Sequence, residues 1–260
     1  MAQASAATST GTAPVGTLPH EPRAVDAGRG ASWWGEAWRL FTPGVGVWLL
    51  ITLILIVLNV VGAIIPVVGA LAMQILMPVF AGGLMLGCRA LDRGNPLTVA
   101  HLFAGFSQRT GPLLVLGLLY TGLAILITLI VAGMMVAVFG VAILGMLTGA
   151  ADPAETGVAL GSVVVAVLLG LLFFLLLLLP LIMAIWFAPA LVMLGGFAPG
   201  AAMKTSFRGC LRNSVPFLVY LVIGIVLAVI ASIPLGLGWF VLGPVTIATV
   251  YTSYCDIFED

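Results

Sequence analysis

Charged side chains are scarce in this sequence and absent from four long stretches. Asp, Glu, Lys and Arg make up 7% of the 260 residues, against about 25% in soluble globular domains. The stretches without any of them are 40–88, 110–151, 156–203 and 213–255. Because a helix needs about 20 apolar residues to cross a bilayer, each stretch is long enough for at least one crossing. The composition excludes an ordinary soluble domain and predicts an all-α, polytopic transmembrane helix bundle.

Ionisable groups are also missing from the interior of every predicted crossing, and this absence excludes several kinds of chemistry. Proton relays, ion pathways and proteolysis by paired aspartates inside a membrane depend on such groups. The histidines His20 and His101 lie outside the crossings, and no Gly-x-Ser-x-Gly motif is present for Ser-His hydrolysis. We therefore expect no catalytic residues, no cofactor and no enzymatic activity.

Only three cysteines are present, and each lies at or near the edge of a charge-free stretch: Cys88, Cys210 and Cys255. An odd number at wide spacing fits neither a disulfide framework nor a zinc site, so we expect reduced thiols and no metal. Nine basic residues balance nine acidic ones. This neutral sum gives no net field that would attract a nucleic acid.

Turn-forming residues divide the first and the last stretch into hairpins. Pro66 and Gly69 interrupt the first stretch, and Pro234 and Gly236 interrupt the last. The two middle stretches lack such a turn, so we expect one main crossing in each. The six predicted crossings are 45–64, 68–88, 112–133, 160–180, 215–233 and 239–255. Eight crossings are the alternative if each middle stretch folds back on itself.

The basic residues define the orientation of these crossings. With six or eight crossings, all nine Lys and Arg residues fall on one side of the membrane, whereas seven would divide them. The positive-inside rule then places both termini in the cytoplasm. Residues 1–30 are rich in small and polar side chains and predict a disordered cytoplasmic tail. An integral membrane helical domain is predicted over 31–258.

Aromatic residues near both ends of this domain are typical of the membrane interface. A helix capped by Ser32 would bring Trp34, Trp38 and Phe41 to one face, which predicts a helix lying in the interface. The alternative is a frayed start to the first crossing. Near the C-terminus, a second aromatic set predicts a belt at the edge of the leaflet: Tyr251, Tyr254 and Phe258.

A basic amphipathic helix is predicted between the fourth and fifth crossings. Lys204, Arg208 and Arg212 recur at every fourth position, so their side chains share one helical face. An apolar set runs beside them: Met203, Phe207 and Leu211. Such a helix lies on the cytoplasmic leaflet and anchors the orientation of the bundle, or it binds an anionic lipid headgroup or a partner protein.

The two halves of the domain, about 31–150 and 156–258, show a weak internal repeat. Phe103-Ala104-Gly105 followed by Pro112 has the same spacing as Phe207-Arg208-Gly209 followed by Pro216. Pro96 and Pro199 precede these elements and are suited to opening a helix. A duplication and independent use of the same helix-start residues both account for this pattern.

Helix breakers occur inside the predicted crossings at Pro78, Gly82, Gly83, Pro180 and Pro189. Paired interruptions of this kind mark substrate sites in some transporters, although those at Pro78 and Pro189 also fit helix termination. Among the few polar residues in the crossings, Asn59 and Gln74 are placed to bond across the first hairpin.

Three segments resemble a family of proteobacterial integral inner-membrane proteins of unknown function. They are Trp38–Phe41, then Pro189–Val192 with Ala202–Phe207, and finally Gly243–Val245 with Tyr251–Phe258. The resemblance covers about residues 33–258. More distantly, the chain is similar to the membrane domain attached to some bacterial glycerophosphodiester phosphodiesterases, without the catalytic barrel. The resemblance implies the bacterial inner membrane and implies no established activity.

The sequence thus predicts a non-catalytic membrane protein that organises lipid or partner proteins through the basic helix. The alternative is a permease or exporter component for a small neutral or apolar solute, which the paired helix interruptions and the half-repeat favour. The expected partners are membrane lipids, other membrane proteins or a second copy of the chain.

Overall fold

The computed structural model describes residues 21–147 and 153–259, with the side chains of 138, 141–147 and 153–163 excepted. Every regular element in these residues is helical, which confirms the predicted all-α class. In chain order the elements are α1 (Arg29–Phe41), η1 (Thr42–Gly44), α2 (Val45–Ala63), α3 (Val68–Asp92), α4 (Ala100–Phe103), α5 (Gly105–Gln108), α6 (Thr110–Leu147), α7 (Pro153–Trp186), α8 (Ala188–Met193), α9 (Pro199–Arg212), α10 (Ser214–Ser232) and α11 (Trp239–Phe258).

Five helical segments in the described residues are long and apolar enough to span a membrane. They are Arg29–Ala63, Val68–Asp92, Thr110–Ala137, Val164–Met193 and Ser214–Ser232. Their outward faces carry large apolar side chains, such as Leu129 on α6 and Leu172 on α7, which are 64% and 63% exposed. Apolar side chains in such numbers are stable when they face lipid or another apolar surface.

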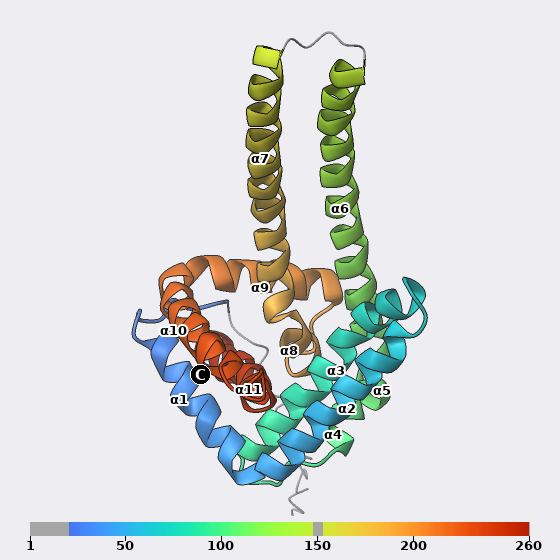
Figure 1. Ribbon diagram of the computed structural model, residues 1–260. Coiled ribbons are helices and arrows are strands. Elements are labelled where there is room, and N and C mark those ends of the chain that lie inside the picture. Colours follow the sequence, from blue (N-terminus) through green and yellow to red (C-terminus); the bar gives the residue numbers. More distant parts are fainter. Residues whose placement is uncertain (1–20, 148–152, 260) are drawn as a thin grey trace, which may run out of the picture.

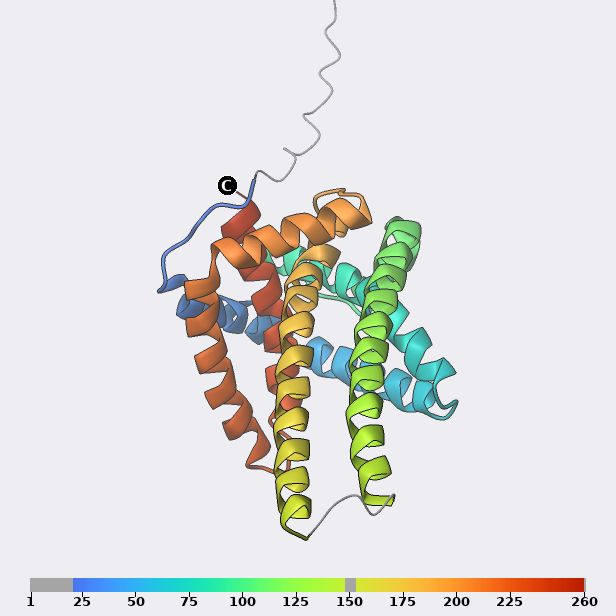
Figure 2. The same cartoon turned by 90° about the horizontal axis from the view of Figure 1, so that it is seen from above.

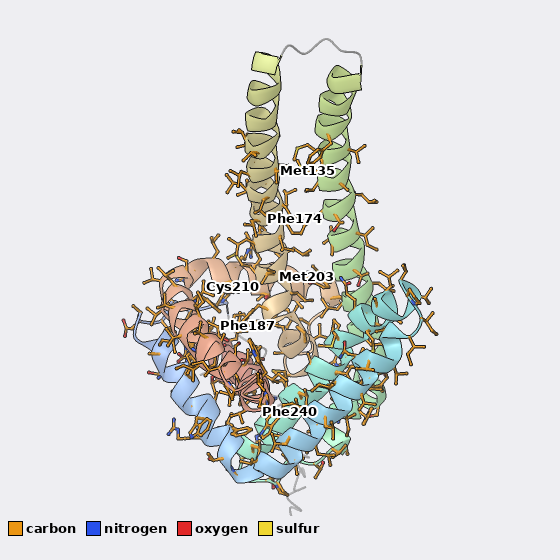
Figure 3. The ribbon with its side chains drawn as sticks, in the orientation of Figure 1. Met135, Phe174, Phe187, Met203, Cys210 and Phe240 are labelled. Atoms are coloured by element: carbon orange, nitrogen blue, oxygen red, sulfur yellow. The ribbon has the colours of Figure 1, made fainter. Side chains whose placement is uncertain are left out.

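The three long hairpins give the molecule its shape. The helices α6 and α7 lie side by side and extend away from the rest of the bundle (Figure 1). Met135 and Phe174 lie between them (Figure 3). Figure 2 shows α9 and the C-terminus at one end of the molecule, and the α10–α11 turn with the far ends of α6 and α7 at the other. The basic helix therefore lies opposite these hairpin ends.

The hairpin turns form where the sequence predicts them. Val67 and Leu235 adopt positive φ angles of 65° and 53°, which reverse the chain between α2 and α3 and between α10 and α11. A Cβ atom at Gly69 would overlap the carbonyl oxygen of Gly62, so only glycine allows this close approach of α2 and α3. The local turn chemistry explains why the ends of these four helices at the turns agree with the prediction to within one residue. At their other ends, α3 and α11 extend to Asp92 and Phe258, beyond the predicted 88 and 255.

The middle stretches differ from the prediction in length. Each forms one continuous helix, α6 with 38 residues and α7 with 34, where the sequence predicted crossings at 112–133 and 160–180. Neither Gly133 in α6 nor Pro180 in α7 ends its helix. Helix breakers are tolerated in apolar surroundings because no water competes for the backbone groups.

The helix α1 does not present the predicted aromatic face. Trp33 and Trp34 are buried, whereas Trp38 is 49% exposed, and the N-cap is Gly28 rather than Ser32. The indole of Trp34 stacks on Tyr220 of α10 at a ring-centroid distance of 4.8 Å. The prediction of an interfacial face was wrong because spacing identifies which residues share a face, not what covers that face.

The predicted C-terminal aromatic belt is wrong for the same reason. Tyr251, Tyr254 and Phe258 are 3%, 0% and 2% exposed, because α11 is covered by α1, α2, α3 and α10. The predicted tail also ends earlier than residue 30. Val25 N donates to the side-chain oxygen of Asn213, whose amide nitrogen donates to Arg23 O. The remainder of the tail, 1–20, lies outside the described residues.

Candidate functional site

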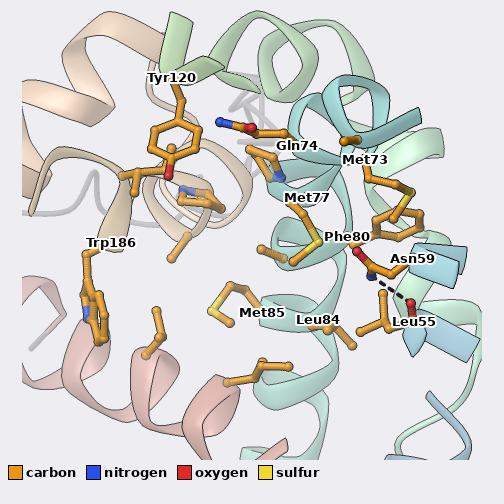
Figure 4. Close-up of a pocket in the computed structure, with 18 of the residues that line it drawn as sticks. Leu55, Asn59, Met73, Gln74, Met77, Phe80, Leu84, Met85, Tyr120 and Trp186 are labelled. Carbon is orange, nitrogen blue, oxygen red and sulfur yellow. Dashed lines mark hydrogen bonds between the residues drawn. The ribbon is translucent and has the colours of Figure 1, made fainter. Parts of the chain in front are cut away.

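A cavity of about 690 Å³ lies in the middle of the bundle. Its walls are formed by α2, α3, α6, the α7–α8 junction and α11 (Figure 4). Its lining is almost entirely apolar: Leu55, Asn59, Ala63, Ala70, Met73, Gln74, Met77, Pro78, Phe80, Ala81, Leu84, Met85, Tyr120, Ile185, Trp186, Pro189, Ala190, Ile247 and Val250. The volume lies within the range of about 300–1,000 Å³ that small-molecule sites occupy.

Two of the predicted helix interruptions meet in the wall of this cavity. Pro78 lies inside α3, and Pro189 stands in the first turn of α8, just after α7 ends. A proline cannot donate to the carbonyl four residues earlier. Those carbonyls belong to Gln74 and Ile185, which also line the cavity. Pro78 therefore leaves the Gln74 carbonyl without its helical donor. The Ile185 carbonyl lies in the last turn of α7, where backbone acceptors have no helical donor.

The other predicted interruptions serve different contacts. A Cβ atom at Gly82 would crowd the side chain of Leu113, and one at Gly83 would overlap the carbonyl oxygen of His101. These two glycines thus let α3 pack closely against α6 and α4. Pro180 lies within α7, away from the cavity lining. Only the prolines at 78 and 189 belong to the site.

Three polar side chains interrupt the apolar lining, those of Asn59, Gln74 and Tyr120. The Asn59 amide donates to the carbonyl oxygen of Leu55 in its own helix at 2.8 Å, in place of the predicted bond across the hairpin to Gln74. Figure 4 shows Gln74 and Tyr120 toward the α6 side of the cavity. These groups offer hydrogen bonds to an uncharged ligand and carry no charge to bind an ion.

The cavity opens along the α2–α3 hairpin, where Asn59, Ala63, Ala70 and Met77 are exposed. The opposite wall is closed, since Leu84 of α3 and its neighbours are buried. Three methionines from α3 line the site, and their flexible thioether side chains adapt to ligands of different shape. The arrangement suits an apolar body with few polar groups that enters between helices.

The segment that the sequence predicts as a basic helix forms α9. Lys204, Arg208 and Arg212 are exposed, and none has an ion-pair partner in the described part of the chain. The buried face of α9 differs from the predicted one, because Leu211 is 57% exposed while Ser206 is fully buried.

Ser206 explains this difference. Its hydroxyl accepts from Phe187 N at 2.9 Å and donates to Met183 O at 2.7 Å, so it satisfies backbone groups where α7 ends. Phe187 and Cys210 lie near this junction (Figure 3). Burial raises the pKa of the Cys210 thiol to about 12, so the thiol is protonated at neutral pH. The sequence does not single out Ser206, because serine side chains are usually exposed.

A second, charged pocket of about 570 Å³ lies at the end of the bundle that holds the C-terminus. Its lining includes Arg23, Arg29, Glu36, Arg39, Leu40, Leu91, Asp92, Tyr251, Thr252, Cys255, Asp256 and Glu259. The Asp256 carboxylate accepts from Arg29 Nε at 2.6 Å and from Trp33 Nε1 at 2.9 Å. Sequence reasoning missed this pocket because Arg29 and Asp256 stand 227 positions apart.

The described residues thus form a helical bundle with apolar outer faces, an apolar cavity and a charged pocket at one end. Within the described residues, no group of three His, Cys, Asp or Glu side chains is arranged to hold a metal ion. No family model matches the chain, and the comparisons with curated proteins and with solved structures give no significant match. The family resemblance in the sequence therefore stays a prediction.

Proposed function

We propose that the chain is a non-catalytic, multi-pass membrane protein that binds an apolar or uncharged amphipathic molecule in the central cavity. The observation that carries this proposal is the convergence of Pro78 and Pro189 on a cavity with an apolar lining. A well-packed bundle has few voids larger than a water molecule. A cavity of this size that opens between helices is suited to a ligand that arrives from the lipid phase.

The proposal includes six crossings, with α11 as the sixth and both termini in the cytoplasm of a bacterial inner membrane. In support, α11 has the 20 residues that a crossing needs. Its Thr, Ser and Tyr side chains make it less apolar than the five candidate spans, and these side chains are buried against other helices. The exposed cations of α9 agree with the positive-inside rule for that end.

Photo-crosslinking tests ligand binding in the cavity. The probe is a diazirine analogue of an uncharged long-chain alcohol, added to the full-length protein in lipid nanodiscs. We expect labelled peptides from α3, between Met73 and Met85. Ala81→Phe, which fills the cavity, should reduce this labelling at least fivefold. Ala132→Phe on the exposed face of α6 is the matched control. Equal labelling in both variants would contradict binding in the cavity.

A second candidate function follows from the exposed cations of α9, which suit an anionic lipid headgroup. Each cation near an anionic surface contributes about 1 kcal/mol. Reversing the charge of Lys204, Arg208 and Arg212 together should therefore remove about 3 kcal/mol of attraction and add repulsion of similar size. Mass spectrometry of the lipid that copurifies with the protein measures the effect. An unchanged ratio of anionic to zwitterionic lipid in the triple variant would exclude this function.

A further inference from the structure

The apolar cavity and the charged pocket lie one after the other along the contact between α3 and α11. The apolar cavity reaches Met85 on α3 and Val250 on α11, and the charged pocket begins at Leu91 and Tyr251. At about 1.5 Å per residue, the interval from Met85 to Leu91 is about 9 Å along the helix axis. Little more than one layer of side chains therefore separates the two spaces.

Cys88 stands between Met85 and Leu91 on α3 and is 0% exposed, as are Trp48 and Ile51 of α2. Ile51 lies one helical turn from Leu55, which lines the apolar cavity. Trp48 donates from Nε1 to the carbonyl oxygen of Leu40, which lines the charged pocket. Buried side chains thus adjoin residues that line each of the two spaces.

Polar bonds fasten α3 to α11 on the charged side of this layer. The Tyr251 hydroxyl donates to Asp92 Oδ2 at 3.1 Å, and Arg89 forms an ion pair with Glu259. The first pair joins α3 to α11, and the second joins α3 to Glu259, the residue directly after α11. Asp92, Tyr251 and Glu259 line the charged pocket. On the other side of the layer the wall is apolar and includes the flexible side chain of Met85.

We propose that α3 and α11 form a gate, and that separation of their charged ends joins the cavity to the charged pocket. An uncharged molecule held in the cavity then passes along this seam to the aqueous side. The pocket suits an exit, because its cationic and anionic side chains nearly balance and hold water without binding an uncharged molecule. This inference rests on the proposed function, since it gives a route to the molecule that the cavity binds.

The native thiol of Cys88 reports whether this layer opens. In a Cys210→Ser, Cys255→Ser background of the full-length protein in nanodiscs, Cys88 is the only thiol. The probe is a membrane-impermeant, cationic methanethiosulfonate reagent. Tyr251→Phe removes the bond to Asp92 and should raise the labelling rate of Cys88 about tenfold. Arg89→Gln breaks the ion pair with Glu259 and should raise the labelling rate of Cys88 by the same factor. Arg93→Gln changes an exposed cation outside both pairs and should leave this rate unchanged.

A second single-thiol background distinguishes gating from general loosening. With Cys88→Ser and Cys255→Ser, the only thiol is Cys210, which lies on the buried face of α9 and donates to the carbonyl oxygen of Met183 in α7. Its labelling rate should not change in Tyr251→Phe. An equal rise at Cys210, or no rise at Cys88 in either gate variant, would overturn the gate. Loss of cavity labelling in Ala81→Phe with no response at Cys88 would leave the proposed binding intact and reject the gate alone.

Discussion

The α6–α7 hairpin and the α3–α11 contact differ in which side chains they expose and which they bury. In the hairpin, the most apolar side chains are the most exposed, as Leu129 and Leu172 show. In α11, by contrast, Thr249 and Thr252 are 1% and 8% exposed, and the Thr252 hydroxyl donates to the carbonyl oxygen of Trp33 in α1. Thr249 accepts or donates a bond to Tyr220 of α10 at 2.9 Å. Polar side chains are buried here because neighbouring helices supply their partners.

This difference reverses the usual relation between apolarity and burial. In water, the hydrophobic effect drives apolar side chains into the core. In lipid it gives no such drive between helices, and packing with hydrogen bonds holds the bundle together. The most apolar helices therefore lie at the periphery, and α3 and α11 form the interior. Breaking contacts in each region should show which of them stabilises the fold.

The largest contrast is expected for two leucines of α6. Leu116 is fully buried, whereas Leu129 is 64% exposed. Leu116→Ala removes packing and leaves a cavity, which should lower the free energy of unfolding by about 3 kcal/mol. Leu129→Ala should change it by less than about 0.5 kcal/mol. Unfolding of both variants in the same detergent measures this, and equal losses would show that the outer face of α6 is covered.

Local features of the sequence predicted much of this fold. The ends of α2, α3, α10 and α11 at the two hairpin turns follow from Pro66 and Pro234, whereas the far ends of α3 and α11 lie beyond the predicted residues. The orientation of aromatic faces could not be predicted, because helical spacing does not say which neighbour covers a face. Trp34 illustrates this, since its partner Tyr220 is distant in the chain. Pro96 also did not start a helix, because α4 begins only at Ala100, whereas Pro199 begins α9 as predicted.

A smaller contrast is expected for two glycines. A Cβ atom at Gly83 would overlap the carbonyl oxygen of His101, whereas one at Gly133 would meet no atom within 4 Å. Gly83→Ala should therefore destabilise the protein by about 2 kcal/mol by forcing α3 away from α4. Gly133→Ala should be neutral or stabilise α6 by up to about 1 kcal/mol. Thermal unfolding in detergent distinguishes the two variants. Equal melting temperatures would mean that α4 shifts to accommodate the new methyl group at no cost in stability.

The candidate site was predicted in its parts and not as a whole. Four residues stand out in the sequence, because prolines interrupt the helical hydrogen bonds and amides are polar groups in apolar helices: Pro78, Pro189, Asn59 and Gln74. Their meeting in one cavity depends on how α3 packs against α8, and no local pattern contains that contact. The charged pocket was missed because its network joins the first helix to the last.

The smallest expected effect concerns Ser206, whose hydroxyl joins α9 to the end of α7. Ser206→Ala leaves Phe187 N and Met183 O without the partners that the hydroxyl provides. An unsatisfied buried backbone group costs about 1–3 kcal/mol, so we expect a loss of about 1.5 kcal/mol. Ser107→Ala is the matched control, because the exposed Ser107 hydroxyl bonds only to Ala104 of the preceding turn. If both variants unfold alike, the end of α7 is held by its apolar contacts, and the hydroxyl bridge contributes nothing.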